Sequence, residues 1–219
     1  MNATLVVSLF LTGALCLAQD PVKVAPNQYK LIAENDDVRV IEVNLAAGAK
    51  TATHSHPAVM SVLLNPGVVK WTQPSGKSEQ SPPDLKRGSV VNLPAETHVS
   101  ENMGKTTLRA IVVEFKKPAP PAGKARKASV VATCKPLSES PHATAQLCTG
   151  AAGSLVAKHT HAASVIYVPL TDVTAELTGA DGKPRLMEMK SGVPIIAPPE
   201  THSGVNKGKA FELVVVDLK

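Results

Sequence analysis

The sequence predicts an all-β protein, and three observations support this fold class. Valine stands in short runs such as VRVIEV, SVLL, SVVNL, AIVVEF, SVIYV and ELVVVDL, which are typical of strands. Gly, Pro, Asn and Asp bound these runs, as turn residues do. After residue 18 no long stretch has a helical hydrophobic period. Because only 3% of the 219 residues are aromatic, the core must be built from Val, Leu, Ile and Ala.

The first 18 residues differ from the rest and predict a signal peptide. LVVSLFLTGALCLA is an uncharged apolar run that is followed by the polar segment QDPVKVAPNQ. This pattern predicts an export signal cleaved between Ala18 and Gln19. The alternative is a membrane anchor, but fourteen apolar residues are too few to span a bilayer comfortably. We therefore expect a periplasmic or secreted protein that has no membrane attachment after cleavage.

The rest of the chain repeats itself. GAKTATHSH in the first half matches GSLVAKHTH in the second, and GSVVNLPAETHVSEN matches GVPIIAPPETHSGVN. The offset is 105 residues for the first pair of segments and 104 for the second. Holding this register over so many residues indicates a tandem duplication. We expect one β domain over residues 27–117, a linker over 118–128 and a second β domain over 129–219.

The excess positive charge belongs to the linker region. The formal net charge is +5, and segment 116–128, KKPAPPAGKARKA, holds five basic residues and no acid, so the remainder is neutral (5 − 5 = 0). A Pro- and Ala-rich basic segment is typical of a semi-extended spacer. Nucleic-acid binding would need basic residues interleaved with aromatic ones on a folded surface. We therefore expect a small-molecule partner and no nucleic acid.

Six of the seven histidines occupy repeated positions. Each half contains a His-x-His pair, and on a strand residues i and i+2 point to the same face. Each half adds a third histidine in its second motif. Neutral imidazoles are good ligands for transition metals, so we expect a divalent metal ion, either iron, zinc, manganese, nickel or copper. The candidate ligands are His54, His56 and His98 in the first half and His159, His161 and His202 in the second. The seventh histidine, His142, has no counterpart and is expected in a turn.

These motifs resemble those of the cupins. Gly48 followed by five residues and His-x-His resembles the first cupin motif, and Gly88, Pro94, His98 and Asn102 resemble the second. The second half repeats both motifs with Gly153, His159, His161, Gly192, Pro198, His202 and Asn206. The resemblance covers nearly everything from residue 27 onward, and the chain is similar to small exported bacterial bicupins. It implies two tandem jelly-roll barrels, each a double-stranded β-helix, and leaves the oligomeric state open.

The chain departs from the cupin pattern at the glutamate that follows the His-x-His pair. Met60 stands at its place in the first half and Val165 in the second. Gly67 then lies at the expected distance after Met60, so the first barrel is expected to hold the metal if only one barrel does. Sites of three histidines without a carboxylate resemble those of thiol dioxygenases and of a diketone dioxygenase.

That resemblance implies an oxygen-dependent dioxygenase that acts on a small organic anion. Arg39 and Arg109 are the candidates to pair with a substrate carboxylate, although neither recurs in the second half. The second hypothesis is a non-catalytic module that binds a small ligand or a metal, because one fold can host many functions.

Glu96 and Glu200 precede the third histidine of each half by two positions. On a strand, each would share the face of that histidine and serve as a metal ligand, a hydrogen-bond partner of the histidine or a general base. In a turn, each would face solvent. Pro94 and Pro198 favour the turn, so we expect solvent-facing glutamates.

Two cysteines remain after the predicted cleavage, Cys134 and Cys148, and they are equidistant from Pro141. A hairpin that turns at Pro141 would pair them across its two strands. Together with an export signal, this spacing predicts a disulfide bond. Tyr29 and Val43 stand at the matching positions of the first half, so the disulfide is particular to the second.

Overall fold

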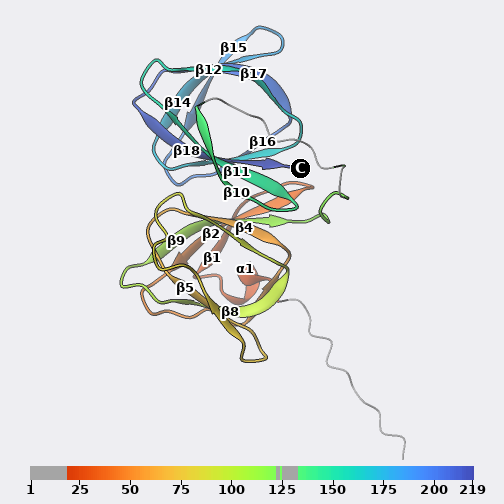
Figure 1. Ribbon diagram of the computed structural model, residues 1–219, viewed down its shortest axis with the longest axis vertical. Helices are drawn as coiled ribbons and strands as arrows, with labels where there is room; N and C mark the ends of the chain where they lie inside the picture. The colour runs from red at the N-terminus through yellow and green to blue at the C-terminus, as the bar shows by residue number, and fades with distance from the viewer. Residues whose placement is uncertain (1–18, 122–123, 125–132) are drawn as a thin grey trace, which may run out of the picture.

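The computed structural model describes residues 19–121, 124 and 133–219 and consists almost entirely of antiparallel strands (Figure 1). The predicted signal peptide lies outside the described residues, as does most of the predicted linker. Within the described ranges, no helix is long and apolar enough to cross a membrane. The first half contains α1 (Pro21–Val24), β1 (Tyr29–Glu34), β2 (Val38–Leu45), β3 (His54–His56), β4 (Val59–Leu63), β5 (Val69–Thr72), β6 (Ser78–Gln80), β7 (Val90–Leu93), β8 (Glu96–Asn102) and β9 (Leu108–Phe115). The second half contains β10 (Cys134–Glu139), β11 (Ala143–Gly150), β12 (Leu155–His161), β13 (Val165–Pro169), β14 (Val173–Gly179), β15 (Pro184–Met189), β16 (Ile195–Ala197), β17 (Glu200–Asn206) and β18 (Phe211–Leu218).

The two halves have the same sheet topology. In the first barrel, a five-stranded sheet of order β1-β2-β9-β4-β7 accompanies a four-stranded sheet of order β3-β8-β5-β6. In the second barrel, the orders are β10-β11-β18-β13-β16 and β12-β17-β14-β15, which match strand for strand. The predicted all-β class with two tandem jelly-roll barrels is therefore confirmed. Closing two sheets over one core leaves few free sheet edges.

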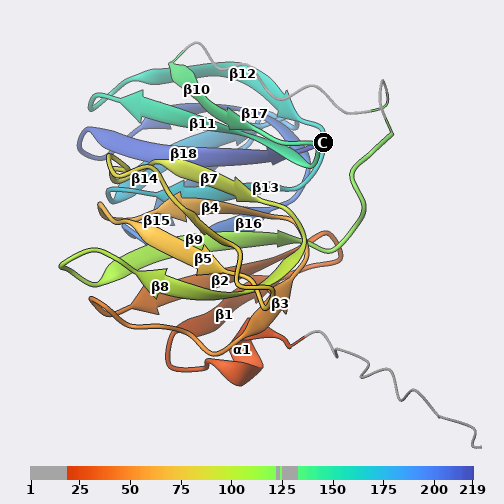
Figure 2. The ribbon, with the colours of Figure 1, turned by 60° about the horizontal axis from the view of Figure 1, so that its bottom comes forward.

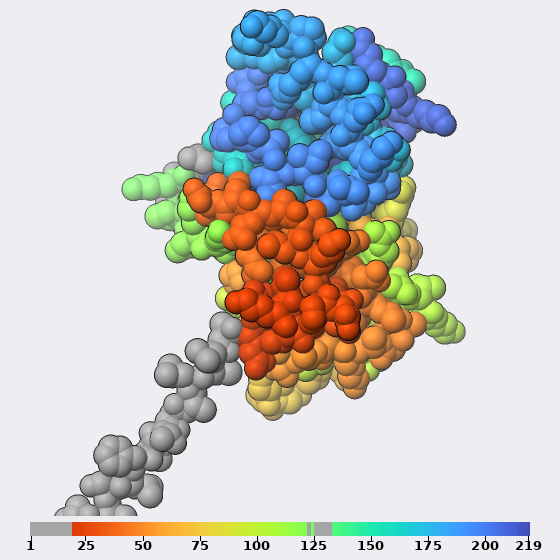
Figure 3. Space-filling view, turned by 180° about the vertical axis from the view of Figure 1, so that it is seen from behind, coloured from red at the N-terminus to blue at the C-terminus, as the bar shows by residue number. Residues whose placement is uncertain are grey.

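The barrels pack against each other through their five-stranded sheets (Figure 2). The space-filling view shows the two halves of the chain in direct contact (Figure 3). On β9, Leu108 and Ala110 face the interior of the first barrel, whereas Ile111 and Val113 face the second barrel. Both faces of this strand are therefore buried along its apolar run 110–113, which explains why that run does not alternate between apolar and polar residues. A single buried cluster joins the barrels and consists of Val38, Val40, Met60, Val62, Ile111, Val113, Phe115, Ala143, Ala145, Ile166, Val168, Leu170, Val214 and Val216.

Polar and aromatic contacts at the margin of this interface add specificity. Arg87 of the first barrel donates a hydrogen bond to the Leu170 carbonyl oxygen at 2.8 Å and pairs with Glu212. His142 lies in the bend between β10 and β11, and its ring stacks on Phe115 with 4.7 Å between ring centroids. This histidine therefore contributes to the contact between the barrels. The other six histidines instead lie inside the barrels.

A disulfide bond joins the first two strands of the second barrel. Cys134 of β10 and Cys148 of β11 are direct cross-strand partners, and their sulfurs are bonded. The matching partners in the first barrel are Tyr29 and Val43, as the sequence repeat predicted.

We expect non-reducing peptide mapping of the mature protein to recover Cys134 linked to Cys148. Because the bond closes a loop with a sequence separation of 14 residues, its reduction should lower the free energy of unfolding by about 3 kcal/mol. Urea unfolding with and without reductant measures this difference. Cys134→Ser should lose the same stability and become insensitive to reductant. Two free thiols in protein purified without reductant would contradict the prediction.

Candidate metal centres

Turns with positive φ place the histidine strands. The four motif glycines, Gly48, Gly88, Gly153 and Gly192, have φ between 70° and 83°. A side chain would be strained in this conformation, so glycine is required. The motif asparagines brace the same loops. Asn102 donates hydrogen bonds to the carbonyl oxygens of Leu45 and Thr106 at 2.8 Å, and Asn206 does so to Ala151 and Lys209.

Strand pairing brings the third histidine of each barrel opposite the first. His54 of β3 lies across from His98 of β8, and His159 of β12 lies across from His202 of β17. The second histidine of each His-x-His pair shares the face of the first, so the three rings of a barrel point into one interior. The structure thus places all six predicted histidines inside the barrels, three in each.

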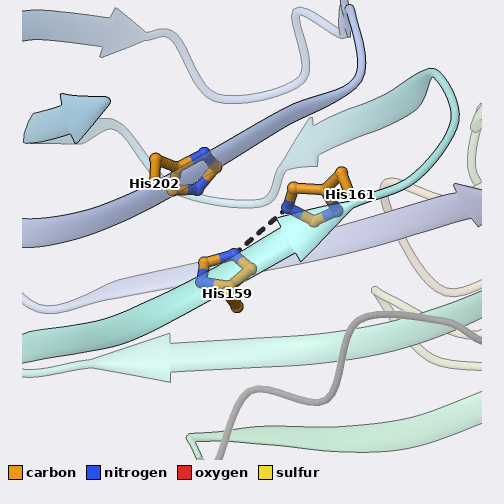
Figure 4. Close-up of side chains that lie close together, drawn as sticks. All are labelled: His159, His161 and His202. Carbon is orange, nitrogen blue, oxygen red and sulfur yellow. Dashed lines mark hydrogen bonds between the residues drawn. The ribbon is translucent and has the colours of Figure 1, made fainter. Parts of the chain in front are cut away.

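In the second barrel the three histidines converge (Figure 4). One ligand nitrogen from each of His159, His161 and His202 lies within 4.8 Å of the others. The Nε2 atoms of His159 and His161 are 3.2 Å apart. His161 and His202 are almost fully buried, and His159 is partly exposed.

Each Nδ1 atom of this cluster has an acceptor beside it. His159 Nδ1 lies 2.8 Å from the Ala157 carbonyl oxygen, and His161 Nδ1 lies 2.5 Å from Asp217 Oδ1. His202 Nδ1 lies 3.0 Å from Glu200 Oε1 but makes no hydrogen bond to any of the described residues. The Nδ1 atom of His159 donates its proton to the Ala157 carbonyl oxygen, and its Nε2 atom lies 3.2 Å from the Nε2 atom of His161. Two ring nitrogens this close can share a proton or a cation, so this donor set fits a metal ion.

In the first barrel the histidines are less converged. The group whose ligand atoms lie within 4.8 Å of one another is His56, Glu96 and His98, and His54 is not part of it. The ring centroids of His54 and His56 are 6.2 Å apart, against 4.9 Å for His159 and His161. His54 Nε2 lies 3.3 Å from the Tyr29 hydroxyl. The structure thus brings two of the three predicted ligands together with a glutamate, and the third lies beside them.

The expectation of solvent-facing glutamates needs correction. Glu96 Oε1 lies 2.9 Å from His98 Nδ1, and the Glu96 side chain is only 15% exposed. Glu200 lies similarly close to His202 and is held by two hydrogen bonds from Arg185 at 2.7 and 2.8 Å. Both glutamates are the first residues of strands β8 and β17. The strand has therefore already begun at the position where the prolines suggested a turn.

The expectation that Met60 occupies the position of the cupin glutamate also needs correction. Two residues separate His56 from β4, but three separate His161 from β13. Strand pairing therefore makes Val59, and not Met60, the counterpart of Val165. Met60 is fully buried in the cluster between the barrels. It fills the core and faces away from the histidines.

Sequence reasoning missed four polar residues that lie inside the barrels. Tyr29 and Tyr167 are the two tyrosines of the chain, and each hydroxyl lies 3.3 Å from a histidine Nε2, of His54 and His161 respectively. Glu114 and Asp217 are buried carboxylates on the last strand of each barrel. The sequence does contain a pattern that indicates the two carboxylates. In the repeated segments IVVEF and VVVDL, an acidic residue interrupts an otherwise apolar strand at the same place.

Burial sets the protonation of the site. Burial, followed by the neighbouring His159, lowers the pKa of His202 to about 4, and burial, followed by His56, lowers the pKa of His98 to about 4. Both rings are therefore neutral at pH 7, which is the state in which imidazole binds a metal. Burial raises the pKa of Tyr29 to about 12 and also raises the pKa of Tyr167. Both hydroxyls therefore keep their proton and act as hydrogen-bond donors.

The cavities that contain the histidines are mostly apolar. Among the described residues that line them there is no lysine or arginine. Arg39 is bonded to Glu114 at 2.9 Å and to Asp20 at 3.2 Å, and Arg109 pairs with Glu42 outside the cavity. Neither predicted arginine is therefore available to a substrate carboxylate in this conformation.

Comparison with solved structures identifies the fold. The chain is similar to AerE from Microcystis aeruginosa (TM-score 0.62, 14% identity), a match that covers 88% of this chain and 97% of that chain. It is similar to a variant of oxalate decarboxylase from Bacillus subtilis (TM-score 0.63, 12% identity), over 86% of this chain and 71% of that chain. It is also similar to a cupin 2 conserved barrel domain protein from Leptotrichia buccalis (TM-score 0.53, 15% identity), over 87% of this chain and 88% of that chain.

At these identities the likeness establishes a shared fold. The chain has the cupin fold in its two-barrel form and is a bicupin in architecture, as the histidine motifs indicated. No family model matches the sequence, and no curated protein matches it.

Proposed function

We propose that this protein is an exported bicupin that binds divalent metal ions through the three histidines of each barrel. One observation carries the proposal: in the second barrel, one ring nitrogen from each of His159, His161 and His202 lies within 4.8 Å of the others, and the Nε2 atoms of His159 and His161 are 3.2 Å apart. A cation can occupy the space that these nitrogens share. Export is supported by the N-terminal sequence alone.

A bound metal would make an oxygen-dependent oxidation the most suitable reaction. Such an ion supplies Lewis acidity, open ligand positions and, for iron, manganese or copper, redox chemistry with dioxygen. The residues of the chain hold the ion, exclude water and supply hydrogen-bond donors. In the second barrel the Tyr167 hydroxyl, 3.3 Å from His161 Nε2, places such a donor beside the ligands.

The residues that line the cavity specify further the class of the proposed substrate, a small organic anion. Three neutral histidines leave the charge of a divalent ion uncompensated at the ligand positions, which favours an anionic group there. The described lining offers no lysine or arginine for a second anionic group. Leu177, Phe211 and Val215 of the second cavity offer apolar contact instead. We therefore propose a substrate with one anionic group and an apolar body.

Metal analysis of the purified mature protein tests this function. After incubation with iron, zinc, manganese, nickel or copper and removal of free ions, we expect up to two ions per chain for the best-bound metal. A folded protein that retains none of these metals would refute the proposal.

Oxygen consumption distinguishes an enzyme from a binding module. An enzyme loaded with iron, manganese or copper should consume oxygen with at least one compound in a panel of thiols, diketones and hydroxy acids, and lose this activity with its metal. The alternative function, a non-catalytic binding module, predicts no oxygen consumption with the whole panel but a higher unfolding temperature with one of its members.

A further inference from the structure

Each barrel carries one buried carboxylate at the same position of its last strand. Glu114 on β9 and Asp217 on β18 are 1% and 5% exposed. Strand pairing places Glu114 opposite Arg39 of β2 and Asp217 opposite Thr144 of β11. Each is the one carboxylate among the described residues that line its cavity. The duplication has therefore kept an interior acid in both barrels, although an uncompensated buried charge is costly.

The two carboxylates have different partners. Asp217 Oδ1 accepts a hydrogen bond from His161 Nδ1 at 2.5 Å, and Gln146 Nε2 lies 3.4 Å from the other oxygen. Glu114 Oε2 instead accepts a hydrogen bond from Arg39 Nη1 at 2.9 Å. The acid thus contacts a candidate metal ligand in the second barrel but a cation in the first.

The residue opposite the acid explains this difference. In the first barrel Arg39 reaches Glu114 and neutralises it. In the second barrel the matching residue is Thr144, whose short side chain cannot do so. Its hydroxyl has no hydrogen-bond partner among the residues that the structure describes. The corresponding histidine of the first barrel, His56, bonds the neighbouring carbonyl oxygen of Pro57 through Nδ1 at 2.6 Å.

We propose that Asp217 is a positioning residue that fixes His161 as a metal ligand, and that the exchange of Arg39 for Thr144 between the barrels makes the second barrel the tighter metal site. A carboxylate on Nδ1 holds the ring orientation, keeps the proton on Nδ1 and makes Nε2 a stronger donor to a metal. All three histidines of the second barrel converge, whereas the matching group of the first barrel contains Glu96 and leaves out His54, which agrees with this role. The assignment reverses the expectation from sequence, which favoured the first barrel. It rests on the proposed metal binding.

Zinc affinity of single-site proteins tests the proposal. His98→Ala leaves only the second site intact, and His202→Ala leaves only the first; each Kd is measured by competition with a chelator. We expect the second site to bind Zn²⁺ more tightly. Adding Asp217→Asn to His98→Ala should raise the Kd about 10- to 100-fold, the usual effect of losing an outer partner of a histidine ligand. Adding Glu114→Gln to His202→Ala is the matched control and should leave the Kd of the first site unchanged.

Nitrogen NMR of the metal-free protein gives a readout that does not depend on metal. His161 should show a single Nδ1–H tautomer in the wild type and a mixture of tautomers in Asp217→Leu, which has no acceptor. An equal Kd for Asp217→Asn and its parent, or an equal loss for Glu114→Gln, would overturn the proposal. An unchanged His161 tautomer in Asp217→Leu would also overturn it. Unfolding of both Asp217 variants would overturn it as well, because Asp217 would then be a structural residue.

If the wild type binds none of the metals, the proposed function fails. In that case the tautomer measurement decides separately whether Asp217 positions His161.

Discussion

Replacing His202 by alanine should abolish the proposed metal binding of the second barrel and leave the fold intact. His202 is one of three converging candidate ligands, and two imidazoles form a much poorer metal site than three. The affinity should fall by more than the roughly 10- to 100-fold that follows loss of a partner of a ligand. The apolar sheet faces should maintain the barrel, because burial of apolar surface is the dominant favourable term in folding.

Metal content after dialysis against a chelator, together with thermal unfolding of the metal-free protein, measures both effects. His142→Ala is the matched control, since this histidine stacks on Phe115 between the barrels. Its metal content should equal that of the wild type. Wild-type metal content in His202→Ala would contradict the assignment of the ligand, and outright unfolding of this variant would make the histidine structural.

Ile166→Ala in the second barrel should destabilise both barrels together. Ile166 is fully buried in the cluster that joins the two five-stranded sheets. Removal of its side chain should lower the free energy of unfolding by about 2–5 kcal/mol, the range for such truncations in a packed core. Because residues of both barrels form this cluster, we expect one cooperative transition.

The single tryptophan makes the coupling measurable. Trp71 belongs to β5 of the first barrel, so its fluorescence reports on that barrel, whereas far-ultraviolet circular dichroism reports on both. Both signals should shift to the same lower urea concentration in Ile166→Ala. Leu155→Ala, at a side chain that is 71% exposed, should change stability by less than about 0.5 kcal/mol. An unchanged Trp71 transition in Ile166→Ala would show that the barrels unfold independently.

Much of this protein could be predicted from local sequence patterns. The strand runs, their turn residues and the repeat predicted the all-β class and the two barrels, because side-chain periodicity and backbone freedom act over a few residues. The six histidines at repeated positions predicted which residues enter the barrel interiors. The equal spacing about Pro141 predicted the pairing of Cys134 with Cys148, because residues at equal distances from the turn of a hairpin lie opposite each other on its two strands.

Only the tertiary structure decided what surrounds these histidines. Asp217 and His161 are 56 residues apart in sequence, and no local pattern indicates that they meet. A one-residue difference in the connection before β4 and β13 moved Met60 from the predicted site to the interface between the barrels, since each step along a strand reverses the side-chain direction. Likewise, the two barrels share the same histidine motifs but surround them differently. Strand pairing places Arg39 opposite Glu114 in the first barrel and Thr144 opposite Asp217 in the second. The sequence alone therefore determined the class of site, whereas long-range strand pairing decided the partners of each ligand, because those partners come from strands far apart in the chain.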